Sequence, residues 1–402
     1  MLNSFQTVII LMVISRIDNI KDSGNFVIAY AVANLLIMIG KYGVRQFQVS
    51  DIKEKYSFKT YFIHRMITVF FMVICSILYV SFYLFSGSYS IEKSLYVLLI
   101  CGVKAIEAFE DVIHGMFQQH SRLDIAGKIL SIRLFLYTIE FMIIYFFTHN
   151  LLLTSLICFC TALLLCVFLN RTTLVSFSYT IGTYNTSSLF NLFRECFPIF
   201  VSTFLMAYVA NAPKYSIDIV LTSQEQAMFN YIFMPVFVIS LLSTFIYQPM
   251  INGLAVIWLK HDLKHFWELI ARQILIIFSF TLLALVGGYF LGIPVLSLLY
   301  SVNLTSYKND LLILLVGGGM LALVNFLTMV ITITRYQKHL IWGYLFISIL
   351  FVLLGRHFAV SSGVNGISIF YTVCMSILAL IFFLYIMLIA RFSGHKSFKD
   401  NL

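Results

Sequence analysis

Stretches of about twenty consecutive apolar residues recur along this chain from one end to the other, and they restrict its fold more than any other feature. A helix of that length spans the hydrocarbon layer of a membrane and satisfies its own backbone hydrogen bonds there. The chain is 61% hydrophobic and 11% charged, whereas soluble domains carry about 25% charged residues. We therefore predict an all-α, polytopic membrane protein.

The apolar stretches divide into twelve predicted spans. They lie near residues 3–18, 24–42, 62–85, 95–117, 127–148, 150–170, 196–221, 228–255, 270–292, 309–334, 340–360 and 364–391. The longest polar stretch follows the sixth span, as expected for a transporter built from two bundles. We therefore predict two six-helix bundles around a central cavity: an N-terminal lobe (1–170), a cytoplasmic linker (171–195) and a C-terminal lobe (196–402).

The basic residues predict the orientation of these spans. With both termini cytoplasmic, 18 of the 26 Lys and Arg residues fall in inner segments, among them Arg65, and 5 fall in outer ones. This is the asymmetry that the positive-inside rule describes. The net charge of +9 is accordingly a topology signal, and we expect no nucleic-acid partner. The first span begins almost at Met1 without a basic region or cleavage site, which favours a membrane helix over a signal peptide.

Enzyme and metal motifs are absent from the sequence. The seven cysteines lie in or beside apolar runs without metal-ligand spacing, and we interpret them as small buried hydrophobes. The Gly317-Gly318-Gly319 triplet lies inside an apolar helix, which favours close helix packing over phosphate binding. Because every connection is short, a large catalytic domain is excluded. We predict no enzyme activity, no metal and no cofactor, apart from H⁺ or Na⁺ as a possible coupling ion.

A charged stripe lies inside the fourth predicted span. Charged residues at bilayer depth are costly and mark functional sites by default. One hypothesis is a cavity wall whose carboxylates bind a coupling cation, and the alternative is an internal cluster in which Lys104 pairs with Glu107 or Asp111. The acids outnumber the single lysine, so a further cationic partner is expected. The stripe consists of Lys104, Glu107, Glu110, Asp111 and His114.

The seventh predicted span offers such a partner. Asn211, Lys214 and Asp218 fall at i, i+3 and i+7, beside Pro213. A proline-broken turn there would leave backbone groups open to a ligand, and we favour a cavity-lining role for these residues. The alternative is that Lys214 pairs with Asp218 one turn away.

Further basic residues lie where the first two spans end. Arg16 closes the first span, and Lys41 and Arg45 follow the second. Arginine presents a planar fork that suits phosphate oxygens, and lysine presents a point charge. The alternative is that these side chains extend to the membrane interface. Arg133 and Glu140 are seven residues apart and are predicted to share an inward face of the fifth span.

Four groups of residues match the pattern of one family of membrane proteins. They are 39–51 (IGKYGVRQFQVSD) with 56–58 (YSF); Glu110-Asp111, Gly115, Gln118, 122–124 (RLD) and 126–127 (AG); 211–218 (NAPKYSID); and 245–249 (FIYQP). In that order they resemble the second helix and its following loop, the fourth-to-fifth helix junction, and the seventh and eighth helices of bacterial polysaccharide flippases, the O-antigen and capsule repeat-unit exporters of the multidrug/oligosaccharidyl-lipid/polysaccharide superfamily. The family usually has further residues before the first helix, and this chain departs from the pattern there.

The resemblance implies a cargo and a location. The cargo is an undecaprenyl-diphosphate-linked oligosaccharide, turned across the bacterial inner membrane for O-antigen or capsule synthesis. Membrane lipids, a polysaccharide polymerase and a chain-length regulator are the implied partners. The implied ligands of the diphosphate and glycan are Arg16, Arg45, Lys104, Lys214 and Asn211, and the implied cation-coupling sites are Glu107, Glu110, Asp111 and Asp218.

Two other functions remain open at this point. A drug or cation exporter of the same superfamily would need an apolar or acidic cavity. The four inward cations, Arg16, Arg45, Lys104 and Lys214, disfavour that function. A membrane polysaccharide polymerase would need a long outer loop carrying arginines, and no outer loop here is long.

Overall fold

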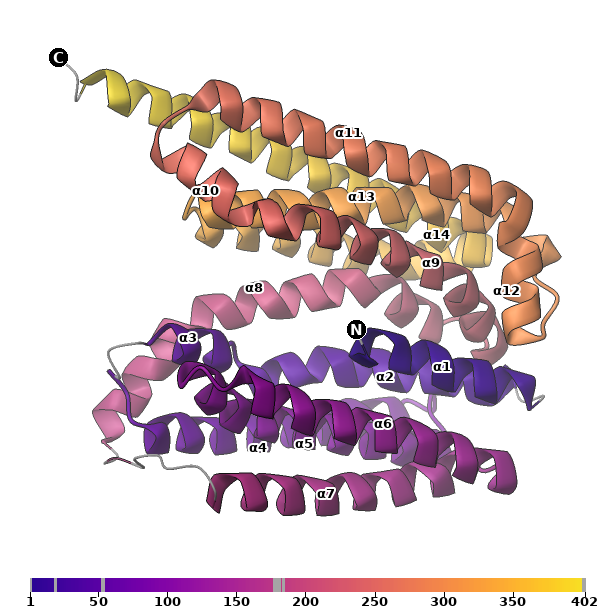
Figure 1. The fold of residues 1–402 in the computed structure, drawn as a ribbon. Helices are drawn as coiled ribbons and strands as arrows, with labels where there is room; N and C mark the ends of the chain where they lie inside the picture. The colour runs from indigo at the N-terminus through magenta and orange to yellow at the C-terminus, as the bar shows by residue number, and fades with distance from the viewer. Residues whose placement is uncertain (1, 18–19, 52–54, 176–181, 183–184, 400–402) are drawn as a thin grey trace. The chain divides into compact units, whose positions relative to one another are not determined.

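The computed structural model describes residues 2–399 except for 18–19, 52–54, 176–181 and 183–184. For residues 2–5, 50, 172, 174–175, 249, 252 and 392–399 it describes the backbone only. Helices make up nearly all of the described part of the chain, and that part contains no strand (Figure 1). The predicted all-α fold is confirmed.

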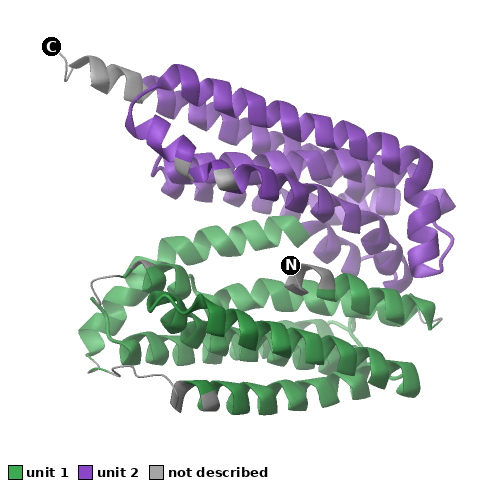
Figure 2. Cartoon of the chain, in the orientation of Figure 1, with its two compact units in different colours: residues 1–211 green, residues 212–402 purple. Residues whose placement is uncertain are grey.

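The chain separates into two compact units, residues 1–211 and 212–402 (Figure 2). The boundary lies within one long helix, α8 (Thr186–Asp218). The linker predicted at 171–195 is partly helical, because the preceding helix α7 continues to Val175 and α8 already begins at Thr186. The rest of that linker is described only at residues 182 and 185.

The first unit is a bundle organised around one helix, α5. Its helices are α1 (Leu2–Arg16), α2 (Ile20–Lys41), α3 (Val44–Ser50), α4 (Phe58–Phe85), α5 (Ile91–Gln119), α6 (Leu123–Thr148) and α7 (Leu151–Val175). Helix α5 packs against α2, α3, α4, α6 and α7. Because neighbours surround it on all sides, its charged stripe faces protein and not lipid.

The second unit is organised around α13 in the same manner. Its elements after α8 are α9 (Ser223–Tyr247), η1 (Gln248–Met250), α10 (Ile251–Leu259), α11 (Leu263–Gly287), η2 (Gly288–Gly292), α12 (Ile293–Tyr300), η3 (Thr305–Tyr307), α13 (Lys308–Ile333), η4 (Gln337–His339) and α14 (Leu340–Lys399). Helix α13 packs against α9, α11 and α14. The backbone of α14 breaks at Ser362 and Gly363, so two helices follow one another there.

The twelve predicted spans correspond to helices of this structure. Nine helical segments of the described chain are long and apolar enough to cross a membrane. Helix α1 is shorter, α5 carries too many charges to qualify by composition, and α14 contains two spans on either side of its break. The protein is therefore a multi-pass membrane protein with twelve spans in two bundles.

The glycine triplet of α13 allows close packing, as predicted. A Cβ atom on Gly318 would lie 3.0 Å from the backbone Cα of Val236 in α9, and one on Gly317 would lie 2.8 Å from Oγ1 of Thr372 in α14. Gly319 faces Thr281 of α11 at similarly close range. Each glycine therefore admits a different neighbouring helix.

Two helices continue through prolines without interruption. Helix α8 runs through Pro198 and Pro213, and α9 runs through Pro235. The predicted broken turn at Pro213 is wrong in this respect, although proline still lacks the amide that would donate a hydrogen bond there. Pro249 coincides with a change of helix type, in η1 between α9 and α10, and Pro294 lies in the first turn of α12, directly after η2.

Large apolar side chains cover the outside of the bundles. Phe82 is 68% exposed and Leu283 is 71% exposed. A soluble monomer rarely exposes so much contiguous apolar surface, whereas lipid contact favours it. Other exposed apolar side chains include Phe70, Leu78, Leu164, Phe168, Phe290, Leu298, Val352 and Leu353.

Candidate functional site

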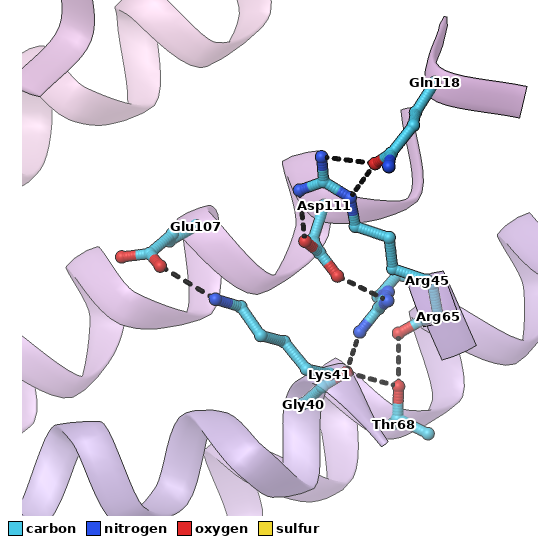
Figure 3. Close-up of polar contacts among 8 residues, drawn as sticks. All are labelled: Gly40, Lys41, Arg45, Arg65, Thr68, Glu107, Asp111 and Gln118. Carbon is cyan, nitrogen blue, oxygen red and sulfur yellow. Dashed lines mark hydrogen bonds and ion pairs between the residues drawn. The ribbon is translucent and has the colours of Figure 1, made fainter. Parts of the chain in front are cut away.

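Asp111 of α5 binds two arginines from different segments. Its Oδ1 lies 3.1 Å from Nη1 of Arg45 in α3, and its Oδ2 lies 3.0 Å from Nη2 of Arg65 in α4 (Figure 3). The Arg45 guanidinium also donates to Oε1 of Gln118 from Nε and Nη2, at 3.2 and 3.0 Å. Arg65 donates in addition to the carbonyl oxygen of Gly40 at the end of α2. One carboxylate thus connects α3, α4 and α5.

Glu107 lies one turn before Asp111 and binds two lysines. Its Oε1 lies 2.9 Å from Nζ of Lys41 at the end of α2, and its Oε2 lies 2.7 Å from Nζ of Lys104 on its own helix. The Lys104 ammonium also lies 5.7 Å from the ring centroid of Tyr30. The alternative in which Lys104 pairs with Glu107 is the one formed, and Lys41 is an additional partner.

Glu110 faces a third direction and is completely buried. Its Oε2 lies 2.8 Å from Nη1 of Arg133 in α6, and its Oε1 accepts a hydrogen bond of 3.0 Å from Nδ2 of Asn170 in α7. Arg133 and Glu140 were predicted to share an inward face; Arg133 binds Glu110, and Glu140 accepts a hydrogen bond from Thr161 of α7. The acids at i, i+3 and i+4 therefore point to different helices around α5.

Small residues allow these charged groups to approach one another. Gly43 and Tyr42 have positive φ values of 68° and 47° and form the turn between α2 and α3. This turn places Arg45 beside Asp111 instead of continuing α2. A Cβ on Gly115 would collide with the Gln48 side chain of α3, so a larger residue would force Gln48 to move where α3 crosses α5.

These eight charged residues form what we call the ion-pair network: Lys41, Arg45, Arg65, Lys104, Glu107, Glu110, Asp111 and Arg133. Five cations face three carboxylates, so the network carries two unbalanced positive charges. Lys41 and Arg45 each have side chains 30% exposed, whereas the other six side chains are 12% exposed or less. The accessible edge of the network is therefore cationic.

A small pocket lies within the network. Lys104, Glu107 and Arg133 line it together with Tyr30 and Tyr137. Its free volume of about 20 Å³ is enough for one water molecule. His114, the remaining member of the stripe, is 3% exposed and its Nε2 has no hydrogen-bond partner among the described residues. The interior of this unit is thus polar as well as charged.

Lys214 is a buried cation of the second unit. Lys214 is 7% exposed, and its ammonium group forms no ion pair with any described residue. Its Nζ lies 5.5 Å from the ring centroids of both Phe233 and Phe237 in α9, and cation–π contacts of this kind stabilise an ammonium only partly. The alternative pairing of Lys214 with Asp218 is not formed.

The structure does not bring all the predicted site residues together. Arg16 is exposed at the end of α1, beside the start of α2, whereas Lys41 lies at the other end of α2, roughly 30 Å away at 1.5 Å per residue. The amide of Asn211 donates to the carbonyl of Ala207 in its own helix. Asp218 is half-buried at the last residue of α8.

Sequence reasoning missed two members of the network. Arg65 was assigned to an inner segment, but it is completely buried within α4. Arg133 was predicted to face inward, but the sequence indicated no partner for it. An arginine inside an apolar run was the available signal for both, because such residues are rare in spans and are usually paired.

Comparison with known proteins shows which solved structures have a similar fold. No protein-family model matches the sequence. An inward-facing multidrug resistance MATE family transporter of the MOP superfamily is 13% identical, with a TM-score of 0.70 over 97% of this chain and 96% of the other. The chain has the fold of MOP superfamily transporters.

Two further proteins are similar to this chain. A MOP superfamily transporter from Pyrococcus furiosus, reported to have a binding pocket of reverse polarity, is 14% identical with a TM-score of 0.60, over 97% of this chain and 92% of the other. The capsular polysaccharide biosynthesis protein CapF of Staphylococcus aureus is 23% identical over 337 residues, which cover 82% of each chain. The two solved structures are of transporters, and the sequence relative is named for capsular polysaccharide biosynthesis.

Proposed function

We propose that this protein is a flippase that moves undecaprenyl-diphosphate-linked oligosaccharides across the bacterial inner membrane, for capsule or O-antigen synthesis. The observation that carries the proposal is the cationic edge of the ion-pair network. The similarity to a capsular polysaccharide biosynthesis protein supports the same cargo. Both termini are then cytoplasmic, and a polysaccharide polymerase and a chain-length regulator are expected partners. No catalysis is required.

The network can receive a diphosphate without leaving a buried charge unpaired. If phosphate oxygens bind Lys41, Glu107 keeps Lys104 at 2.7 Å. If they bind Arg45, Asp111 keeps the completely buried Arg65 at 3.0 Å. Unpaired buried charges are strongly destabilising, so this redundancy makes exchange of an anionic ligand feasible. The arginine fork suits phosphate oxygens and the lysine adds a point charge.

Lys214 and Lys104 are further candidate ligands for the anion. Lys214 lacks an ion-pair partner among the described residues, so an anion would neutralise a buried charge. Arg16 and Asn211 belong to the same proposal, although the first lies at the other end of α2 and the second bonds its own helix. We expect their contributions to be smaller.

Coupling to H⁺ or Na⁺ is proposed at Glu107 and Asp111. Their side chains are 12% and 10% exposed, whereas that of Glu110 is 0% exposed. When a coupling cation binds one of these carboxylates, Lys41 or Arg45 is released and can bind the diphosphate. Glu110 and Asp218 remain candidates, but Glu110 is enclosed by Arg133 and Asn170.

A drug or cation exporter is the second candidate function, because the inward-facing solved structure of the same fold is a multidrug resistance transporter. The excess of cations in the network disfavours a cationic drug. The two functions differ in their ligand: an anionic lipid diphosphate for the first, and an organic cation for the second.

The decisive experiment is deletion of the gene in its host, followed by analysis of lipid-linked intermediates and surface polysaccharide. A flippase deletion accumulates complete repeat units in the inner leaflet and abolishes the surface polymer. Unpolymerised single repeat units on the surface would assign a polymerase instead. An unchanged glycan profile together with increased drug sensitivity would establish the exporter and overturn our proposal.

A further inference from the structure

Glu140 is an acidic residue inside a membrane span that does not belong to the ion-pair network. It lies eight residues before the end of α6 (Leu123–Thr148), about 12 Å inside that helix at 1.5 Å per residue. Its hydrogen-bond partner Thr161 lies ten residues after the start of α7 (Leu151–Val175), about 15 Å inside. Both side chains are therefore far from either membrane surface.

The contact between Glu140 and Thr161 lies at the edge of the seam where α6 packs against α7. Both residues are half-buried, between a buried face and an exposed face of their helices. On the buried side Tyr137 is 4% exposed. The exposed apolar side chains beside the contact are Leu136 and Ile143 of α6 and Ile157 and Leu164 of α7. The carboxyl group is thus bordered by a surface that suits lipid.

Glu140 has no counter-charge among the described residues. Its Oε1 accepts a hydrogen bond of 2.6 Å from Oγ1 of Thr161, and no Lys, Arg or His forms an ion pair with it. Its titratable neighbours within one turn of the contact are two thiols and a phenol, none of which can be a cation: Cys158, Cys160 and Tyr137.

The charged groups on the helices that pack against α6 are engaged elsewhere or lie towards helix ends. Those helices are α1, α5 and α7. The groups of the ion-pair network and the α5 stripe are Lys104, Glu107, Glu110, Asp111, His114 and Arg133, and the groups towards helix ends are Arg16, Glu92, Lys93, Asp124, Lys128 and Arg171. The surroundings of Glu140 therefore differ from those of the paired acids.

This difference decides which form of each acid is stable. Glu107, Glu110 and Asp111 each bind at least one cation, which favours the charged carboxylate. A carboxylate without a cation in apolar surroundings neutralises itself by taking up a proton. The neutral acid can still accept from Thr161 on Oε1, while its Oε2 holds the proton.

We propose that Glu140 is a proton-binding site at the seam of α6 and α7, and that it is occupied at neutral pH. A hard metal cation takes several oxygen ligands, whereas Thr161 supplies one, and the described residues contain no cluster of three His, Cys, Asp or Glu side chains that could hold a metal. The site shares no residue with the ion-pair network. It therefore rests neither on the proposed cargo nor on coupling at Glu107 and Asp111.

The test is infrared difference spectroscopy on the full chain in lipid nanodiscs at neutral pH. A protonated carboxyl group has a C=O stretching band that a carboxylate lacks. We expect Glu140→Gln to lose an acid band that the parent has, and to keep the melting temperature of the parent, because its amide carbonyl can still accept from Thr161. The matched control is Glu107→Gln, which removes a carboxylate bound by two lysines and should leave the acid band unchanged.

Carbodiimide labelling at neutral pH gives a second readout. Dicyclohexylcarbodiimide enters lipid and adds whole to a protonated carboxyl group as an N-acylurea, whereas a water-soluble carbodiimide reaches groups exposed to water. We expect the first reagent to label Glu140 and the second to label Glu92, which is exposed in the first turn of α5. Thr161→Val removes only the donor and should keep both the acid band and the label.

Two outcomes overturn the proposal. One is an acid band that is the same in the parent and in Glu140→Gln. The other is labelling of Glu140 by the water-soluble reagent, which would show a carboxylate in contact with water. If neither reagent labels Glu140, the infrared difference alone decides.

Discussion

Arg65 and Asp111 form an ion pair in which the arginine side chain is completely buried and its Nη2 lies 3.0 Å from Oδ2 of the aspartate. The pair connects α4 to α5. Arg65 also donates a hydrogen bond to the Gly40 carbonyl of α2. Arg65 therefore links the Asp111 carboxylate of α5 to the end of α2 (Figure 3).

Asp111→Asn is expected to destabilise the protein. It leaves the Arg65 guanidinium buried without its counter-charge, and breaking a buried pair by removing one partner costs about 3–5 kcal/mol. The measurement is the melting temperature of the purified protein in detergent. The control is Asp124→Asn, which breaks a pair with Arg122 that is about half exposed on both sides, and such pairs contribute little. Equal melting temperatures for the two variants would contradict the structural role of Asp111.

Glu110 and Arg133 are expected to behave as a coupled pair. Glu110→Gln alone leaves Arg133 uncompensated in a site where both side chains are 5% exposed or less, which costs about 3 kcal/mol. The double variant Glu110→Gln/Arg133→Gln should recover much of that loss, because replacing both partners of a buried pair is often near neutral. Additive effects in the double-mutant cycle would show that the two residues do not interact.

Lys41→Met and Arg45→Met are expected to impair transport and to leave the fold intact. Both cations lie at the exposed edge of the network, and the carboxylate that each one binds keeps a second cation. We predict at least a tenfold decrease in surface polysaccharide, which corresponds to about 1.4 kcal/mol of lost anion binding. The measurement is polysaccharide output in the complemented deletion strain, with protein level as control. Parental output from the double variant would exclude these residues as diphosphate ligands.

Lys214→Ala is expected to abolish surface polysaccharide while the protein remains inserted. The change removes a buried cation that has no ion-pair partner among the described residues, so stability should hold or increase. The matched control is Lys308→Ala, because Lys308 also lies over an aromatic ring, that of Tyr289, at 3.8 Å. Normal output from Lys214→Ala would remove the lysine from the substrate path.

Gly318→Ala is expected to destabilise the second unit by about 1–3 kcal/mol, the usual range for overpacking. The added Cβ would lie 3.0 Å from the Val236 backbone, which cannot rotate away. Gly287→Ala is the control, because no atom lies within 4 Å of its added Cβ, and alanine has the better helix propensity. A melting temperature of Gly318→Ala at or above that of the parent would contradict the close α9–α13 packing.

Much of the fold was predictable from the sequence, because the length and hydropathy of each span are local properties. The twelve helices and the close packing at Gly317–Gly319 were predicted in this way. Their ends were harder to predict: α8 begins ten residues before the predicted span and runs through Pro213. A proline tolerated by its neighbours leaves no local signal that distinguishes a continuous helix from a broken one.

Only part of the candidate site was predictable. The stripe on α5 is a pattern within one helix, whereas most of its partners come from other helices. Sequence alone determined that Lys104, Glu107, Glu110 and Asp111 need polar surroundings, because a charge in lipid is costly. Only the tertiary structure decided that Arg65, Arg133 and Lys41 supply them. Which cation meets which carboxylate depends on how each neighbouring helix is rotated about its axis, and that rotation is set by packing against several helices at once.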